Sequence, residues 1–115
     1  MATFTKRKLE SSTNGLSILV VGTTTSDAST IHTAHATAQD EVYLYCVNTH
    51  TAAVVLTIEF GGTAAKDLIK QTIAVAPSGM VLLVPGFPLT GSVVVKAFCP
   101  TTNVVGIYGF VNRIA

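Results

Sequence analysis

The sequence predicts an all-β fold, an antiparallel β-sandwich of about eight strands with a jelly-roll or immunoglobulin-like arrangement. Three observations lead to this prediction. Threonine and valine, which favour a pleated backbone, are abundant throughout the chain. Short apolar runs follow one another at intervals of roughly 8–12 residues, with Gly and Pro turn residues between them. No segment has a convincing helical pattern.

The clearest pair of strands covers residues 41–48 and 54–60. In the first, the even-numbered residues 42–46 point one way and the odd-numbered residues 43–47 point the other. In the second, the even-numbered residues point inward, which places Val55, Thr57 and Glu59 outward. Gly61 and Gly62 end this strand, because glycine adopts turn dihedrals without steric cost. The two strands therefore form a predicted hairpin.

The remaining strands are predicted over residues 16–21, 29–37, 68–75, 80–84, 92–99 and 104–113. The turn Pro77-Ser78-Gly79 precedes the strand 80–84, and the Pro-Gly-Phe-Pro segment 85–88 interrupts the chain after it, because proline cannot donate to a β-ladder. Residues 1–15 are polar and mixed, and we expect an extended arm that orders against a neighbouring subunit, or a frayed terminus. Residues 16–115 then form a single sandwich domain.

The chain carries unusually little charge. Charged residues make up 11% of its 115 residues, against about 25% in an average soluble domain, and the net charge is +1. So little charge gives weak repulsion between copies, and nucleic acid is not an expected partner. No apolar run approaches the roughly 18–20 residues of a spanning helix, so no membrane partner is expected. The basic N-terminus resembles a signal peptide only weakly, and we expect a chain that is made in the cytoplasm and not exported.

Three predicted strands are apolar on both faces, whereas a sandwich strand with one solvated face should alternate. Such strands are either covered on both sides or buried in a subunit interface. A third layer is not expected in so small a domain, so we favour an interface. The predicted interface residues are Met80, Leu82, Val84, Val93, Val94, Val95, Val104, Val105, Ile107 and Tyr108. Lys6, Arg7 and Lys8 are candidate contacts of the N-terminal arm.

The sequence predicts no enzyme, no metal site and no cofactor. His32 and His35 are three residues apart on a predicted strand, so they point to opposite faces and do not share a metal. Asp40 and Glu41 diverge for the same reason, and we expect both at a strand entrance in water. No G-x-S-x-G nucleophile elbow is present.

Cys46 and Cys99 both lie in predicted strands, where they act as small buried hydrophobic residues. We expect free thiols, because two cysteines do not make a disulfide scaffold and the expected compartment is reducing. An inter-sheet bridge of the immunoglobulin type is the alternative, although that pattern also includes a core tryptophan and this chain has none.

Four stretches are the basis of a resemblance to known proteins: residues 40–49, residues 56–62, the motif Val84-Pro85-Gly86 and the ending 109–114. These stretches resemble small proteins encoded in tailed-bacteriophage genomes, over roughly residues 30–115. The resemblance implies a virion component made in the host bacterial cytoplasm, such as a capsid decoration or cement protein that clamps shell subunits. The partners would be the major capsid protein or other virion proteins, and copies of the chain itself in a dimer or trimer.

Other positions on a particle are open at this stage. The resemblance does not separate a head decoration protein from a head–tail connector or a tail component. A glycan- or host-surface-binding module of a phage fibre is a further alternative, for which Tyr43 and Tyr45 would be the ligand-facing residues. The absence of tryptophan weighs against that alternative.

Overall fold

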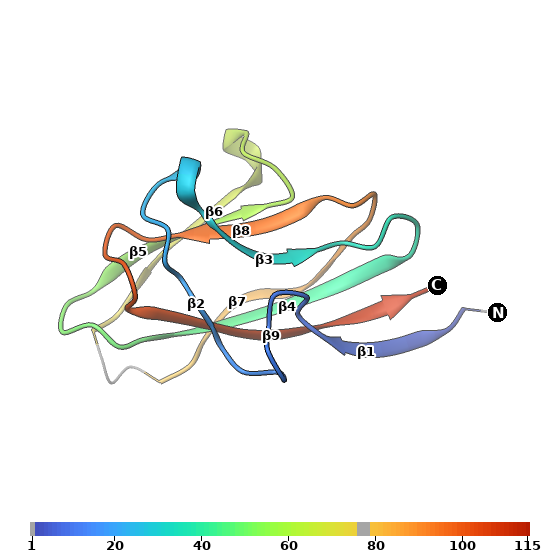
Figure 1. Cartoon of the computed structure of the whole chain (residues 1–115), viewed down its shortest axis with the longest axis horizontal. Helices are drawn as coiled ribbons and strands as arrows, with labels where there is room; N and C mark the ends of the chain where they lie inside the picture. The colour runs from blue at the N-terminus through green and yellow to red at the C-terminus, as the bar shows by residue number, and fades with distance from the viewer. Residues whose placement is uncertain (1, 76–78) are drawn as a thin grey trace.

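The computed structural model describes residues 2–75 and 79–115, and it confirms the predicted all-β class. Two antiparallel sheets, sheet A of five strands and sheet B of four, lie face to face (Figure 1). Two short 3-10 turns, η1 (Thr25–Asp27) and η2 (Ala65–Asp67), complete the elements. The strands are β1 (Phe4–Lys8), β2 (Ile18–Leu19), β3 (Ser29–Thr33), β4 (Gln39–Asn48), β5 (Val54–Phe60), β6 (Leu68–Ile73), β7 (Val81–Leu89), β8 (Val94–Phe98) and β9 (Val105–Ile114).

The strand order identifies the sandwich as a jelly roll. Sheet A has the order β1-β9-β4-β7, with the short β2 also paired to β9, and sheet B has the order β3-β8-β5-β6. With β2 set aside, the first strand pairs with the last, the second with the next to last, and so on inward to the β5-β6 hairpin. This nested antiparallel pairing is that of a jelly roll, and it selects the first of the two predicted arrangements.

The core lies between the sheets and follows the alternation read from the sequence. Val42, Leu44 and Cys46 of β4 are completely buried, while the residues between them are half-exposed. On the inward face of β5, Val54, Leu56 and Ile58 are buried as predicted, and Phe60 is half-buried against the core. Thr57 and Glu59, which were expected to face water, are also buried. The reason for Glu59 is that η1 lies over the outer face of sheet B, where the Thr25 hydroxyl donates to its carboxylate.

The N-terminal segment belongs to the domain, whereas residues 1–15 were expected to form an extended arm against a neighbouring subunit or a frayed terminus. β1 pairs antiparallel with β9 and forms one edge of sheet A. The backbones of Thr3 and Ala115 exchange two hydrogen bonds, of 2.8 and 3.0 Å, so the described parts of both termini lie together (Figure 1). Leu9 is only 1% exposed and lies next to Gly109 of β9. Any side chain at position 109 would collide with the backbone of β4. The segment therefore contributes to the core.

The boundaries of β2, β3 and β7 differ most from the prediction. β2 has two residues and β3 ends at Thr33, four residues before the predicted end. β7 continues through Pro85 and Pro88, which were expected to interrupt it. It does so because it pairs with β4 alone among the described strands, so the missing proline N–H groups cost least at this sheet edge. The predicted turn at Pro77 and Ser78 lies outside the described residues.

Both cysteines are free and buried, as predicted. Burial raises the pKa of the Cys46 thiol to about 11. Because the thiolate is the reactive form of cysteine, this side chain is an inert part of the core.

Candidate functional site

Aromatic side chains gather on the outer face of sheet A, which points away from sheet B. The register of β4 and β9 places Tyr43 opposite Phe110 and Tyr45 opposite Tyr108. These four residues alternate with Leu44, Cys46 and Ile107, which are buried between the sheets, so their rings project outward. We call these four residues the aromatic face. Half of the chain's eight aromatic residues therefore lie in two pairs on neighbouring strands.

The rings of the aromatic face are held in place by specific contacts. Tyr43 and Phe110 are stacked, with centroids 4.7 Å apart and an interplanar angle of 14°. The Lys6 ammonium lies 4.7 Å from the centroid of the Phe110 ring, a cation–π contact. On the other side, the Tyr43 ring lies over Gly86, where a Cβ would be 2.6 Å from the ring and φ is +99°. Only glycine both lacks the Cβ that would collide with the ring and adopts this positive φ without steric cost.

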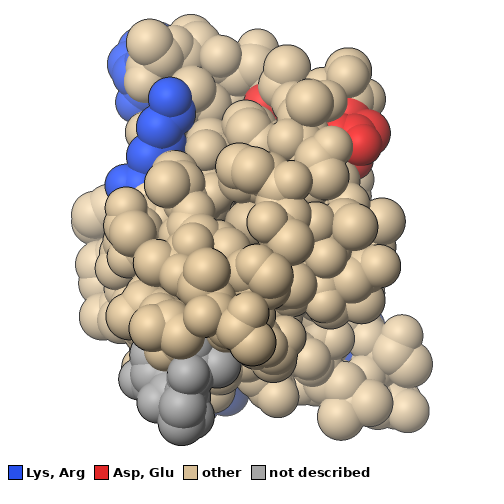
Figure 2. Space-filling view, turned by 90° about the vertical axis from the view of Figure 1, so that its left-hand side faces the viewer, with Lys and Arg blue, Asp and Glu red and all other residues tan. Residues whose placement is uncertain are grey.

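The aromatic face is partly exposed to solvent, and Lys6 adds a positive charge at its Phe110 end. Tyr108 is 36% exposed, and Leu82 of β7, which is opposite Tyr45, is 49% exposed. One end of the sandwich, with the β4–β5 and β8–β9 loops, is also nearly free of charge: charged side chains lie mainly in the two upper corners of Figure 2. An exposed apolar surface next to an uncharged end is typical of a protein–protein contact.

The two edges of sheet A are protected against pairing with another strand. At one edge, β1 presents Lys6, Arg7 and Lys8 in succession, and all of its residues are exposed. At the other edge, β7 contains Pro85 and Pro88 and two irregularities in its register with β4. Charged residues, prolines and bulges at sheet edges disfavour edge-to-edge association. The aromatic face, and not a sheet edge, is therefore the surface of sheet A that is suited to contact a partner.

The structure divides the ten predicted interface residues. The prediction is wrong for four of them, because their side chains lie in the core and cannot reach a partner: Val84, Val95, Val105 and Ile107. Val95 belongs to β8, which is apolar on both sides because core residues alternate there with half-covered ones. In β7 and β9, buried residues follow one another directly, at 83–84 and at 105–107. Three are half-buried, namely Val93, Val94 and Val104, and three are exposed, namely Met80, Leu82 and Tyr108. Of these, Tyr108 belongs to the aromatic face, and Leu82 lies beside it, opposite Tyr45.

Tyr43, Tyr45 and Phe110 were not among the predicted interface residues. The signal for the two tyrosines was present, since they alternate with the core residues of β4. Their pairing with β9 depends on a register between segments about 65 residues apart, which a local pattern does not contain.

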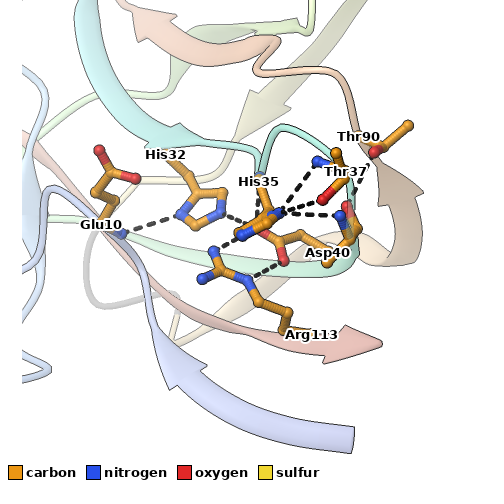
Figure 3. A network of polar contacts seen from close by, with 8 residues as sticks. Glu10, His32, His35, Thr37, Asp40, Thr90 and Arg113 are labelled. Carbon is orange, nitrogen blue, oxygen red and sulfur yellow. Dashed lines mark hydrogen bonds and ion pairs between the residues drawn. The ribbon is translucent and has the colours of Figure 1, made fainter. Parts of the chain in front are cut away.

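A polar cluster lies between the sheets, where β3, β4 and β9 meet (Figure 3). Asp40 is completely buried, which contradicts its predicted place in water. Arg113 donates to both of its carboxylate oxygens, at 2.7 and 3.0 Å. His32 Nε2 lies 2.8 Å from Oδ2, and the backbone N–H of His35 donates to the same oxygen at 3.3 Å. These partners explain why a carboxylate is tolerated inside the sandwich.

The charge state of Asp40 follows from these contacts. Burial would raise the pKa of Asp40, but the hydrogen bonds from Arg113 and His32 outweigh it and lower the pKa to about 2. The same hydrogen bond from Arg113 raises the pKa of its guanidinium. The buried pair therefore stays ionised, and it fixes β9 against β4 across their register.

The His32–Asp40 pair resembles the base and orienting group of a hydrolase, but its geometry is that of a structural link. The second ring nitrogen of His32, Nδ1, accepts the backbone N–H of Glu10 at 3.0 Å. Both nitrogens are thus committed, and the ring is 1% exposed. His35 is exposed beyond the end of β3, where its Nδ1 accepts the N–H of Ala38 at 2.9 Å. Within the described ranges, no group of three His, Cys, Asp or Glu side chains is placed to hold a metal.

No helix within residues 2–75 and 79–115 has the length and hydropathy to cross a membrane. Comparison of this chain with protein-family models, with curated proteins and with solved structures found no match.

Proposed function

We propose that this chain is a non-catalytic structural protein of a phage virion that uses its aromatic face to join copies of itself within a capsid-decorating assembly. The observation that supports this most is the aromatic face itself, formed by Tyr43, Tyr45, Tyr108 and Phe110 on an open sheet face. Aromatic residues are enriched in the cores of protein interfaces, and charged residues are depleted there. The low charge of the chain and its resemblance to phage proteins support the virion setting.

The dimensions of the molecule are compatible with such an interface. The molecule is 48 Å long and 21 Å across its narrowest direction, so a sheet face spans on the order of 1,000 Å², and a standard interface takes about 800 Å² from each partner. A symmetric contact between two identical faces would close without further growth. The protected edges of sheet A would prevent the copies from pairing through their strands instead.

The jelly-roll topology gives secondary support, as an analogy at the level of the fold. Jelly rolls occur in viral capsid domains, but also in lectins and cupins, so the fold alone does not assign the function. In a decorating role, the assembled protein would bridge neighbouring shell subunits and add contact area between them. The head–tail connector and the tail are alternative positions for the same non-catalytic assembly.

Sedimentation equilibrium of the purified protein tests the self-association. We expect the mass of a dimer or trimer of the 12.0 kDa chain, and the same mass at high salt, because an apolar contact is not screened by ions. A monomer at all concentrations, or an assembly that dissociates with added salt, would contradict the proposal. A reconstruction of the virion would then distinguish head, connector and tail.

A second candidate function is glycan binding at the same aromatic face, because an exposed ring on an open sheet also suits a sugar ring. The specific observation is Tyr108, which is 36% exposed and lies opposite Tyr45. A glycan array distinguishes the two functions: saturable binding that Tyr108→Ala removes, by a protein that remains monomeric, would favour the glycan module.

A further inference from the structure

The edge of sheet B at β6 differs from the other sheet edges, because it is regular and open. In sheet A, β1 carries successive basic residues, and β7 carries prolines and register irregularities. At the other edge of sheet B, β3 pairs irregularly with β8, and its Ile31 carbonyl accepts the Ser11 N–H at 3.3 Å. By contrast, β6 has no proline, pairs with β5 without irregularity and carries one charge, at Lys70. An edge of this kind is a template for a further strand.

The hydrogen bonds of β5 show which backbone groups of β6 are free. Gly61 N–H donates to the Val94 carbonyl at 3.2 Å, so the odd-numbered residues of β5 direct their backbone groups to β8. The even-numbered residues direct theirs to β6, where their partners are Ile69, Gln71 and Ile73. Lys70 and Thr72 lie between these partners, so their N–H and C=O groups point away from β5. No described residue bonds to these groups.

A second copy of β6 satisfies the free groups in one antiparallel register. With Gln71 on a two-fold axis, Lys70 of each copy lies opposite Thr72 of the other, and the two residues exchange both backbone hydrogen bonds. On the side that faces sheet A, Ile69 then lies opposite Ile73. The register is therefore complementary in hydrogen bonds, in apolar contacts and in charge.

The neighbouring registers lack this complementarity. With Lys70 on the axis, two ammonium groups would lie directly opposite each other, which is destabilising. A second register would pair Lys70 with Leu68, whose backbone N–H already donates within η2. A third would pair it with Ala74, whose carbonyl already accepts the Asn48 side chain at 2.9 Å.

We infer that β6 pairs with β6 of a second copy, with Gln71 on the two-fold axis, and so continues sheet B from one molecule into the next. The inference goes beyond the proposed function and rests on its self-association: the aromatic face would join copies within one assembly, and β6 would join neighbouring assemblies. A ladder this short is marginal between two free chains. Between copies that are held side by side, the effective concentration is high and the same ladder becomes stable.

Disulfide trapping in the assembled protein tests the inference. In Gln71→Cys, the two Cα atoms would be about 4.5 Å apart in a non-hydrogen-bonded pair, within the range of a disulfide. The matched control is Thr72→Cys, which is more exposed on the same strand, but its two Cα atoms would be about 7–8 Å apart. After mild oxidation of concentrated protein, Gln71→Cys should give at least about ten times more disulfide-linked dimer. Cys46 and Cys99 are buried and should not contribute.

A second pair of variants tests the backbone bonds. Thr72→Pro in the Gln71→Cys protein removes an N–H that points away from β5, so the domain loses no ladder bond. It should lower the yield of linked dimer at least about tenfold, because it blocks the new ladder. Thr72→Val keeps the N–H and should leave the yield unchanged. Urea denaturation should show that both double variants are folded.

Equal yields from Gln71→Cys and Thr72→Cys would overturn the inference, as would a yield that Thr72→Pro leaves unchanged in a folded protein. Sedimentation of the wild type separates the two proposals. A wild-type dimer or trimer whose Gln71→Cys variant is not linked would remove the β6 contact alone. A monomeric wild type whose Gln71→Cys variant is linked in the expected register would overturn only the association through the aromatic face.

Discussion

Replacement of Asp40 by asparagine should lower the free energy of unfolding by about 3 kcal/mol. The carboxylate is completely buried and accepts hydrogen bonds from Arg113, His32 and the backbone of His35. Asparagine removes the charge and leaves the Arg113 guanidinium in the sandwich without a counter-ion. The Arg113 side chain is 20% exposed, so water can partly solvate the unpaired guanidinium. The expected loss of stability is therefore near the lower end of the range for breaking a buried ion pair.

The neighbouring carboxylate provides the control. Glu41 follows Asp40 on β4 and therefore points to the opposite, outer side of sheet A, where it is half-exposed. Glu41→Gln should change the free energy of unfolding by less than about 0.5 kcal/mol. Urea denaturation of the two variants measures the difference. Equal losses for both variants would contradict the structural role of Asp40.

The same pair predicts how stability depends on pH. The pKa of Asp40 is about 2 in the folded protein and 3.8 in an unfolded chain, so unfolding takes up a proton between these values. Ionised Asp40 therefore contributes about 2 kcal/mol to the free energy of unfolding. This contribution is complete above pH 3.8 and is lost as the pH falls toward 2. Asp40→Asn should lack this component of the acid transition, whereas Glu41→Gln should retain it.

Replacement of Tyr108 by lysine should raise the dissociation constant of the self-assembly at least about 100-fold. Tyr108 is the most exposed ring of the aromatic face, and it lies opposite Tyr45. In the assembly, a lysine there would place an ammonium group in an apolar contact, at a cost of several kcal/mol. In the free chain the same ammonium reaches water, so the free energy of unfolding should change by less than about 1 kcal/mol.

Val55→Lys is the matched control for Tyr108→Lys. Val55 is 44% exposed and lies on the outer face of sheet B, so the variant adds the same charge on the opposite side of the sandwich. Sedimentation of the three proteins should show a dissociated Tyr108→Lys variant, with the wild type and Val55→Lys alike. Dissociation of Val55→Lys alone would place the contact on sheet B.

Local patterns were sufficient to predict the fold class and the faces of individual strands. The alternation in β4 correctly separated its buried side chains from its outward tyrosines. Glycines after Phe60 correctly marked the end of β5. Each of these features depends on neighbouring residues, so one sequence contains the necessary information.

The contacts that define the candidate sites join distant segments. Asp40 and Arg113 are 73 residues apart, and Asp40 alone looked like a solvated strand entrance. The Arg7 side chain lies on the inward side of sheet A because the first strand pairs with the last, and no local pattern encodes that pairing. Likewise, Val95 and Ile107 were predicted as interface residues, because an apolar run does not show which of its side chains face the core and which face outward.

Hydroxyl-radical footprinting of the assembled protein tests most directly whether the aromatic face joins the copies. Tyr43, Tyr45 and Phe110 should oxidise several times more slowly in the assembly than in the dissociated Tyr108→Lys variant, which retains these three rings as reporters. Exposed residues of sheet B, such as Val55, should react equally in both. Unchanged oxidation of the aromatic face, together with protection of residues on sheet B, would contradict the account.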